Sequence, residues 1–242
     1  MPNLSVVGVD ISPIAVSLAK KNLEHNIQSQ NLLPRARDEV QFVQADILSP
    51  HSMSPDGSEL GRLLDSLQSR PPVKGQSQGW DLLISNPPYI SPYEFANGTT
   101  KRSVRLYEPT LALVPPIRPA GLSQTVAPSD LVRADTFYPR LLAISAQLGA
   151  RFTVLECGDV AQAQRVAALT GDPSPSPSPG SERNTRTEIW RCDWDSYAHR
   201  ASPNSNEQQP ELTDATEEDR NCDDQPRIPA EQGARAVVIS RY

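Results

Sequence analysis

The sequence predicts an α/β fold with a parallel sheet, and two features lead to this prediction. Short apolar runs rich in β-branched residues alternate along the chain with segments of helical periodicity. One of these runs, Leu82–Ile84, is apolar without alternation, which is typical of a parallel strand covered on both faces. Because ligands bind outside the carboxyl ends of the strands in open α/β sheets, we expect functional residues where these runs end.

The residues after this strand are the strongest functional signal. Asn86-Pro87-Pro88-Tyr89 follows the apolar run, and proline cannot donate to a strand ladder, so the strand must stop at Asn86. This segment suits the presentation of a planar, weakly nucleophilic NH2 group. The Asn86 side-chain oxygen and the Pro87 carbonyl would accept its two hydrogens, and Tyr89 would stack on its plane. The alternative is a plain turn, since Asn and Pro are common turn residues.

The chain opens with a strand over residues 4–10 that turns directly into a helix. Ser12 is placed to cap this helix, and Pro13 fits its first position. Asp10 ends the strand, where a carboxylate can accept both hydroxyls of a ribose or, as an alternative, can serve the turn. The apolar stripe of the helix is predicted to consist of Ile14, Leu18, Ala19 and Leu23.

A second strand over residues 40–45 is followed by Asp46 and Ile47. Asp46 could accept the amino group of an adenine ring while Ile47 packs on the ring face; the alternative is a helix cap after a strand. The connection that follows is rich in Ser, Pro and Gly, and within it only residues 59–67 are predicted to be helical.

Further along, Arg105 and Glu108 are close enough to pair. Such a pair either folds this segment over the site or forms a solvated surface pair, which is the favoured alternative. Helices are predicted over residues 130–148 and 160–169, with a strand over residues 151–157 between them.

The C-terminal part differs in composition, because it contains a Pro/Ser repeat and an acidic stretch. Strands over residues 188–193 and 236–240 are predicted to form a hairpin, and the acidic stretch between them is expected to be disordered. We therefore divide the chain into a partial α/β domain (1–171), a linker (172–186) and hairpin strands of the same domain (187–242) with a disordered insertion (201–235).

Composition narrows the function classes. The net charge of −6 argues against a general nucleic-acid-binding surface. The 24 prolines are about twice the usual share of ~5%, which also indicates unstructured regions. The 3 cysteines and 3 histidines show no metal-ligand spacing, so no metal site is expected, and no run is long enough to span a membrane.

With these residues placed, the chain resembles the HemK/PrmC family of class I S-adenosylmethionine-dependent methyltransferases. Members of this family methylate the glutamine side-chain nitrogen of a Gly-Gly-Gln loop in peptide-chain release factors. The resemblance covers residues 6–169 and 188–242. The motifs that carry it are Gly8–Pro13, Gln44–Ile47, Ser85–Ile90, Val104–Pro109 and Ser240–Tyr242.

The resemblance implies a Rossmann-like methyltransferase sheet that binds S-adenosylmethionine. Asp10 would bind the cofactor ribose, and Asp46 and Ile47 would border the adenine. Asn86 would lie beside the cofactor and, with Pro87, Pro88 and Tyr89, would hold the substrate glutamine. It also implies a monomer with a release factor as partner, in the mitochondrion or, as an alternative, the cytoplasm.

The chain departs from the family pattern in one respect. The family begins its catalytic domain with a strand and a glycine loop for the methionine end of the cofactor, and neither has a counterpart here. We therefore expect an N-terminally truncated chain. By family topology the missing strand lies between the strands that end at Asp10 and Asn86. Without it, these strands either expose unpaired edges or pair with each other.

Two alternatives to glutamine methylation follow from the same residues. Asn-Pro-Pro-Tyr also occurs in methyltransferases that act on the N6 amino group of adenine in nucleic acids, although the acidic charge balance disfavours this activity. The second alternative is an inactive remnant that only binds a release factor, because the glycine loop is missing.

Overall fold

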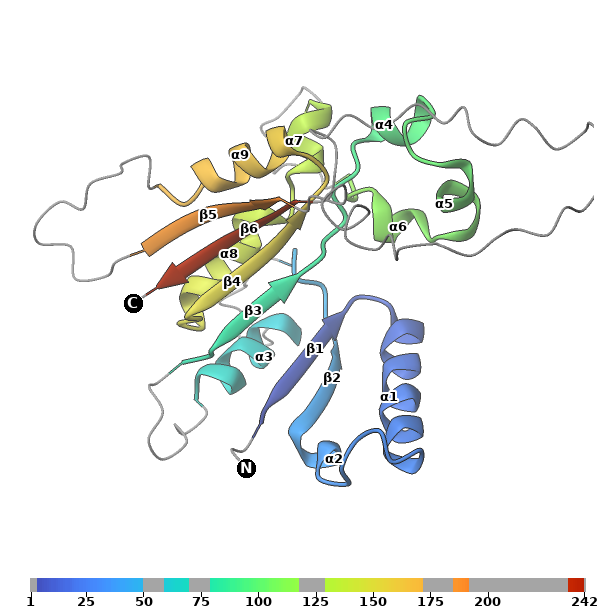
Figure 1. Ribbon diagram of the computed structural model, residues 1–242, viewed down its shortest axis with the longest axis vertical. Helices are drawn as coiled ribbons and strands as arrows, with labels where there is room; N and C mark the ends of the chain where they lie inside the picture. Colours follow the sequence, from blue (N-terminus) through green and yellow to red (C-terminus); the bar gives the residue numbers. More distant parts are fainter. Residues whose placement is uncertain are drawn as a thin grey trace, which may run out of the picture. The chain divides into compact units, whose positions relative to one another are not determined.

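The structure is a computed structural model, which describes residues 4–49, 59–69, 79–117, 129–171, 185–191 and 235–241 (Figure 1). Most of the predicted linker and nearly all of the predicted acidic insertion lie outside the described residues. The strands are β1 (Val6–Asp10), β2 (Val40–Gln44), β3 (Leu82–Ser85), β4 (Phe152–Cys157), β5 (Thr185–Arg191) and β6 (Arg235–Arg241). The helices are α1 (Pro13–Gln28), α2 (Ala36–Glu39), α3 (Glu59–Gln68), α4 (Pro92–Ala96), α5 (Arg102–Tyr107), α6 (Thr110–Leu113), α7 (Asp130–Ala134), α8 (Tyr138–Gln147) and α9 (Val160–Ala168).

The strands form two sheets. β1 and β2 pair in parallel, in register from Val6 opposite Val40 to Asp10 opposite Gln44. The other sheet has the strand order β3-β4-β6-β5, and β6 is antiparallel to both β4 and β5. The predicted α/β class is therefore confirmed, with parallel and antiparallel strands together. Of the two outcomes expected for β1 and β3, the described residues show the first, because these strands do not pair with each other.

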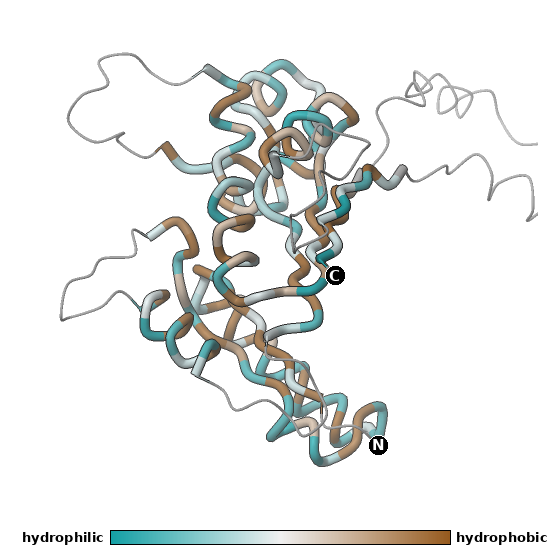
Figure 2. The backbone as a smooth tube through the Cα atoms, turned by 90° about the vertical axis from the view of Figure 1, so that its left-hand side faces the viewer, coloured by the Kyte–Doolittle hydropathy of each residue, from teal (hydrophilic) through white to brown (hydrophobic). Residues whose placement is uncertain are grey.

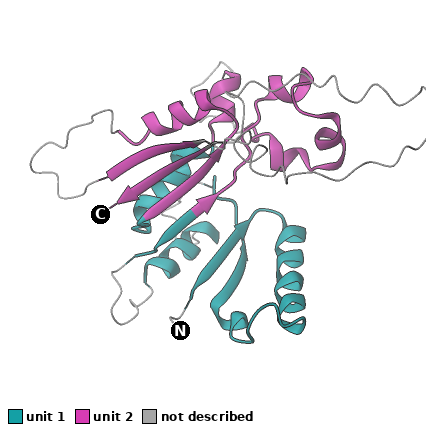
Figure 3. Cartoon of the chain, viewed as in Figure 1, with its two compact units in different colours: residues 1–83, 137–151 teal, residues 84–136, 152–242 magenta. Residues whose placement is uncertain are grey.

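The chain divides into two compact units, which are described separately (Figure 3). Unit 1 comprises residues 1–83 and 137–151, and unit 2 comprises residues 84–136 and 152–242. The division passes through β3, so its first two residues belong to unit 1 and its last two to unit 2.

The core of unit 1 lies where the end of β2 meets α3 and α8. These elements contribute small and branched apolar side chains that exclude water from one another, and this burial stabilises the unit. The buried residues are Ala45, Leu60, Leu64 and Ile144, with Ile47, Leu83 and Leu148 packed against them.

Helix α1 begins as the sequence predicts. The Ser12 side chain accepts a hydrogen bond from the Ala15 N–H, and Pro13 occupies the first turn. The predicted apolar stripe is wrong in part, because Ile14 is 79% exposed and Leu18 is 56% exposed. The helix instead buries Val16 and Ile27. Apolar and polar residues are interspersed along the described chain, as the brown and teal stretches of Figure 2 show, so hydropathy alone does not select the buried face of a helix.

The core of unit 2 is formed by β4, β6 and α9. Residues 153, 155 and 157 of β4 are buried while their neighbours are less so, as expected for a strand whose side chains alternate between faces. Leu155 pairs with Val237, and Thr153 with Ile239, so the buried face continues onto β6. Helix α9 packs on these strands through Ala163 and Val166.

β3 differs from the prediction of a strand covered on both faces. Leu82 is 51% exposed and Ile84 is 72% exposed, whereas the intervening Leu83 packs against the core of unit 1. β3 lies at the edge of its sheet, and within the described residues the face that carries Leu82 and Ile84 is exposed. The strand ends at Ser85, immediately before Asn86, as the two prolines require.

The predicted helix over residues 130–148 is two helices. α7 ends at Ala134 and α8 begins at Tyr138, because Pro139 lacks an N–H and its ring would clash with the carbonyl of a continuous preceding turn. Gly149, at a φ of 62°, ends α8.

The predicted C-terminal hairpin is confirmed by the antiparallel pairing of β5 with β6. β5 begins at Thr185, inside the segment assigned to the linker, and β6 begins at Arg235, the last residue assigned to the insertion. Short polar and charged residues at strand ends carry little local signal, so these boundaries were misplaced by one to three residues.

We expect Leu155→Ala to lower the free energy of unfolding by about 2–5 kcal/mol, because it leaves a cavity between β4, β6 and α9. Urea denaturation measures the loss. The matched control is Leu131→Ala, which truncates an exposed leucine of α7 in the same unit and should change stability by less than about 0.5 kcal/mol. Equal effects of the two substitutions would contradict this description of the core.

Candidate active site

The predicted site residues fall into two groups. Asp10, Asp46 and Ile47 belong to unit 1, and Asn86 to Tyr89 belong to unit 2. Each group lies at the carboxyl end of a strand, as expected. Each group is described by itself.

In unit 1 the ends of β1 and β2 bring Asp10 close to Asp46. The strands are parallel with Asp10 opposite Gln44, and the Ala45 N–H donates to the Asp10 carbonyl at 3.1 Å. The exposed Asp10 carboxylate accepts the Ser12 N–H at 2.7 Å through one oxygen. Asp10 therefore serves the turn, while its second oxygen makes no hydrogen bond within the described residues.

Asp46 and Ile47 form a turn after β2. Asp46 Oδ1 accepts the Leu48 N–H at 2.9 Å, so the acid shapes a turn and does not cap a helix. The Ile47 carbonyl accepts from Arg140 Nε at 3.1 Å, which ties this turn to α8. Sequence reasoning missed Arg140, although it is the single charged residue of an otherwise apolar or neutral helix.

These residues suit the nucleoside part of S-adenosylmethionine. A ribose needs a carboxylate with an accessible oxygen, and an adenine ring needs an apolar surface beside an acceptor. Asp10 would supply the first, and Ile47 with Asp46 would supply the second. The described residues provide no glycine-rich loop for the methionine end.

In unit 2 the segment from Asn86 to Ile90 leaves the sheet in extended form. Asn86 is exposed, and its side chain makes no hydrogen bond within the described residues, whereas Pro87 is buried. The Ile90 N–H donates to the Leu113 carbonyl at 2.9 Å, which anchors the end of the segment. A capping box between Ser91 and Glu94 then starts α4.

Tyr89 is held by the strand next to it. Its hydroxyl donates to Glu156 Oε1 at 3.1 Å, from the end of β4. Burial of the ring, followed by the negative charge of Glu156 and the hydrogen bond to it, raises the pKa of Tyr89 to about 12. Tyr89 is therefore protonated at physiological pH and serves as a donor and a ring surface, not as a base.

The segment that contains Arg105 and Glu108 forms α5 and the turn into α6. The predicted ion pair between these two described residues is not formed. The exposed Glu108 carboxylate instead makes a smaller addition to the negative charge that raises the pKa of Tyr89. Arg105 Nε is buried without a hydrogen-bond partner among the described residues.

Sequence reasoning also missed three residues that contact Tyr89 from the end of β4, the turn after it and the start of α9. These are Glu156, Gly158 and Gln162. One signal was available, since Glu156 interrupts the apolar alternation at the end of β4. The contacts of Gly158 and Gln162 depend on tertiary packing, which periodicity does not reveal.

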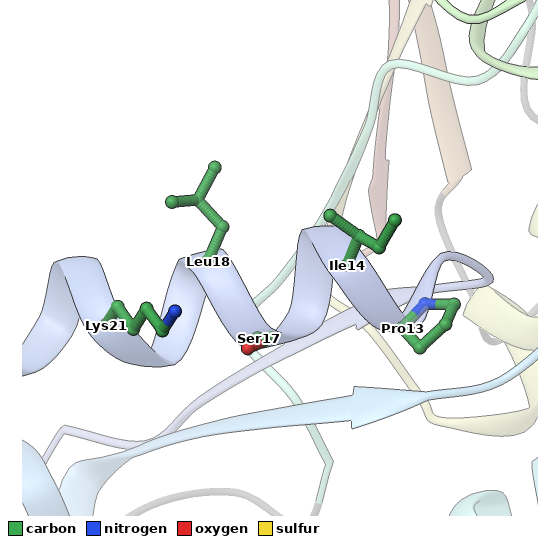
Figure 4. Close-up of a pocket in the computed structure, with 5 residues that line it drawn as sticks. All are labelled: Pro13, Ile14, Ser17, Leu18 and Lys21. Carbon is green, nitrogen blue, oxygen red and sulfur yellow. The ribbon is translucent and has the colours of Figure 1, made fainter.

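A hollow of about 360 Å³ lies elsewhere, on the surface of α1 (Figure 4). All of its lining residues come from this one helix: Pro13, Ile14, Ser17, Leu18 and Lys21. A single helix cannot enclose a ligand, and Asp10 and Asp46 are not among the lining residues, so this hollow is not the candidate site.

The described residues contain no cluster of potential metal ligands and no helix long and apolar enough to cross a membrane.

The chain was compared with known proteins. It is 32% identical over 116 residues to a release factor glutamine methyltransferase from Chlorobaculum tepidum. The relative to which this chain is similar is thus a methyltransferase. The matched stretch covers 48% of this chain and 29% of the relative, so the chain spans under a third of the relative's length. No protein-family model matches the chain.

Two solved structures were also found, both of the hMettl16 catalytic domain, in complex with MAT2A 3′UTR hairpin 1 and hairpin 6. They are 15% and 14% identical to this chain, each with a TM-score of 0.38, and the match covers 98% of this chain and 55% of each of those chains. Similarity at this level does not bear on fold or function.

We expect Glu156→Gln to lower the pKa of Tyr89 from about 12 toward the ordinary value near 10, because the neighbouring negative charge is removed. Ultraviolet absorbance of tyrosinate during a pH titration measures this, after subtraction of the same titration of the Tyr89→Phe protein. Glu188→Gln, which removes a carboxylate from β5, is the matched control and should leave the Tyr89 titration unchanged. An unchanged titration in Glu156→Gln would contradict the effect of the Glu156 charge on Tyr89.

Proposed function

We propose that this chain acts in transfer of a methyl group from S-adenosylmethionine to the side-chain amide nitrogen of a glutamine, in the Gly-Gly-Gln loop of a peptide-chain release factor. The observation that carries the proposal is the state of the Asn86–Tyr89 segment. Its acceptor side chain, that of Asn86, is exposed and makes no hydrogen bond to any residue that the structure describes, while its aromatic ring is fixed by Glu156. A site for a planar amide needs this combination of accessible acceptors and a rigid stacking surface.

Each residue of the segment has a separate role. Asn86 Oδ1 and the Pro87 carbonyl would accept the two amide hydrogens, which holds the nitrogen lone pair in one direction. The Tyr89 ring would stack on the amide plane, and its hydroxyl would remain bound to Glu156. The bound cofactor would supply the electrophilic methyl group. Catalysis would then rest on orientation and on fixed dipoles, not on a strong base.

The charges around Tyr89 favour an uncharged group as the acceptor of the methyl group. The groups that raise its pKa include the carboxylates of Glu156 and Glu108, and the whole chain has a net charge of −6. Such surroundings repel a phosphate backbone but not a glutamine amide. The similarity to a release factor glutamine methyltransferase from Chlorobaculum tepidum also supports a release factor as partner. Action on a mitochondrial release factor stays a prediction.

We expect Asn86→Ala to lower methyl transfer on the order of a hundredfold, because one of two acceptors for the amide hydrogens is lost. The measurement is mass spectrometry of the Gly-Gly-Gln loop of an intact release factor after incubation with the chain and S-adenosylmethionine. Asn97→Ala is the matched control, since Asn97 is an exposed asparagine of the same unit and should have little effect.

The same assay separates the alternatives. Methylated RNA or DNA together with an unmodified release factor would replace the proposal by adenine methylation. An unmodified release factor and unmodified nucleic acid would leave the inactive remnant.

We expect Asp10→Asn to weaken S-adenosylmethionine binding about tenfold, because a charged acceptor for a ribose hydroxyl is lost. Asparagine keeps an oxygen for the Ser12 N–H, so the turn is preserved. Isothermal titration calorimetry measures the affinity. Asp38→Asn, an exposed acid of α2, is the matched control. If the unsubstituted chain does not bind the cofactor, this chain has no activity of its own.

A further inference from the structure

Gln162 is a buried polar residue that the proposed chemistry does not use. It lies in the first turn of α9 and is 3% exposed. The helix begins at Asp159, whose carboxylate accepts the Gln162 N–H at 2.6 Å. This cap fixes the backbone of Gln162, and its side chain lies among three other segments of unit 2.

The Gln162 side chain uses both ends of its amide. Its oxygen accepts the Gly158 N–H at 2.8 Å. Its nitrogen donates to Asp135 Oδ1 at 3.0 Å and to the carbonyls of Tyr89 and Ala134, each at 3.3 Å. A buried amide with partners on both ends specifies one geometry, because any displaced partner would be left unsatisfied.

Asp135, one of these partners, is itself fixed. Arg165 donates to both of its carboxylate oxygens, from Nε at 2.6 Å and from Nη2 at 3.0 Å. Such two-point pairing sets the plane of the carboxylate as well as its position. Because Arg165 lies one turn after Gln162 on α9, the helix holds Asp135 and the Tyr89 carbonyl from a single rigid element.

Tyr89 is thus held at three points by the turn between β4 and α9. Glu156 accepts from its hydroxyl, Gln162 donates to its carbonyl, and Gly158 lies against its ring. A Cβ at Gly158 would lie 3.1 Å from Tyr89 Cδ2, closer than ordinary packing allows. A side chain at position 158 would require the ring or the turn to shift by a few tenths of an ångström.

We infer that Gln162 is a positioning residue, which sets the orientation of the Tyr89 ring and the path of the Asn86–Tyr89 segment through its hydrogen bonds to the Tyr89 carbonyl, Asp135 and Gly158. The orientation of Tyr89 follows from these contacts alone. The catalytic consequence rests on the proposed function. Without these hydrogen bonds, the Asn86–Tyr89 segment would hold the substrate glutamine amide at the wrong angle. Misplacement of a reacting group by about 1 Å lowers the rate by up to a hundredfold.

The test compares Gln162→Met with Gln164→Met. Methionine has nearly the same length as glutamine but cannot form the hydrogen bonds, and Gln164 is an exposed glutamine of the same helix. Tyr89 titration, with the Tyr89→Phe protein subtracted, reports ring position without any need for activity. In Gln162→Met we expect the pKa of Tyr89 to fall from about 12 toward the ordinary value near 10, as the ring moves toward water and away from Glu156. Gln164→Met should retain the original titration.

The kinetic part measures methyl transfer to the release factor. We expect kcat of Gln162→Met to fall about tenfold or more while the affinity for S-adenosylmethionine stays unchanged, because the predicted nucleoside contacts belong to unit 1. Gln162→Leu is a second variant, which removes the same hydrogen bonds with a branched apolar side chain and should reproduce both effects. It keeps the test valid if Gln162→Met does not fold, as judged by circular dichroism.

The outcomes separate the two proposals. An unchanged Tyr89 titration in folded Gln162→Met, or in folded Gln162→Leu where Gln162→Met does not fold, would overturn the positioning role. A shifted titration without any methyl transfer by the unsubstituted chain would support the positioning of Tyr89 and overturn the proposed function instead. A shifted titration with unchanged kcat would overturn the catalytic consequence.

Discussion

The absent N–H groups of Pro87 and Pro88 are the constraint on which the candidate site depends. A strand ladder cannot continue through two residues that have no donor, so β3 ends at Ser85 and the chain must leave the sheet. Asn86 is then exposed at the strand end, and Pro87 is buried. The capping box at Ser91 begins a helix immediately afterwards, so the segment between sheet and helix is short and fixed at both ends.

Because only its two ends are fixed, the segment between β3 and α4 could still rotate unless other residues held it. The turn from β4 to α9 provides this surface, through an acid at the strand end, a glycine and a buried amide. Their chemistry is complementary to one tyrosine: a carboxylate for its hydroxyl, space for its ring and a donor for its carbonyl. The site is therefore built from two stretches of chain about seventy residues apart, of which only one has a recognisable motif.

The features that could be predicted from the sequence are those that depend on interactions between residues close together in the chain. Ser12 and Pro13 specify the start of α1 by short-range hydrogen bonding and ring geometry, and both were predicted correctly. Burial is not local. Ile14 and Leu18 have the composition of a core face but are exposed, and Ile84 was expected to be buried but lies on an edge strand. The partners of Tyr89 were missed for the same reason, since a hydrogen bond between residues 89 and 162 leaves no periodic trace.

The division into units has a consequence for how the chain can be cut. Each unit is assembled from two separate stretches, and the chain crosses between them at residues 83/84, 136/137 and 151/152. Neither unit can therefore be excised as one continuous fragment. A stop codon after residue 136 would deprive unit 1 of α8, which supplies Ile144 to its core, and unit 2 of every strand except the end of β3. Premature termination at or before residue 136 would therefore remove parts of both units at once, although it shortens the chain from one end only.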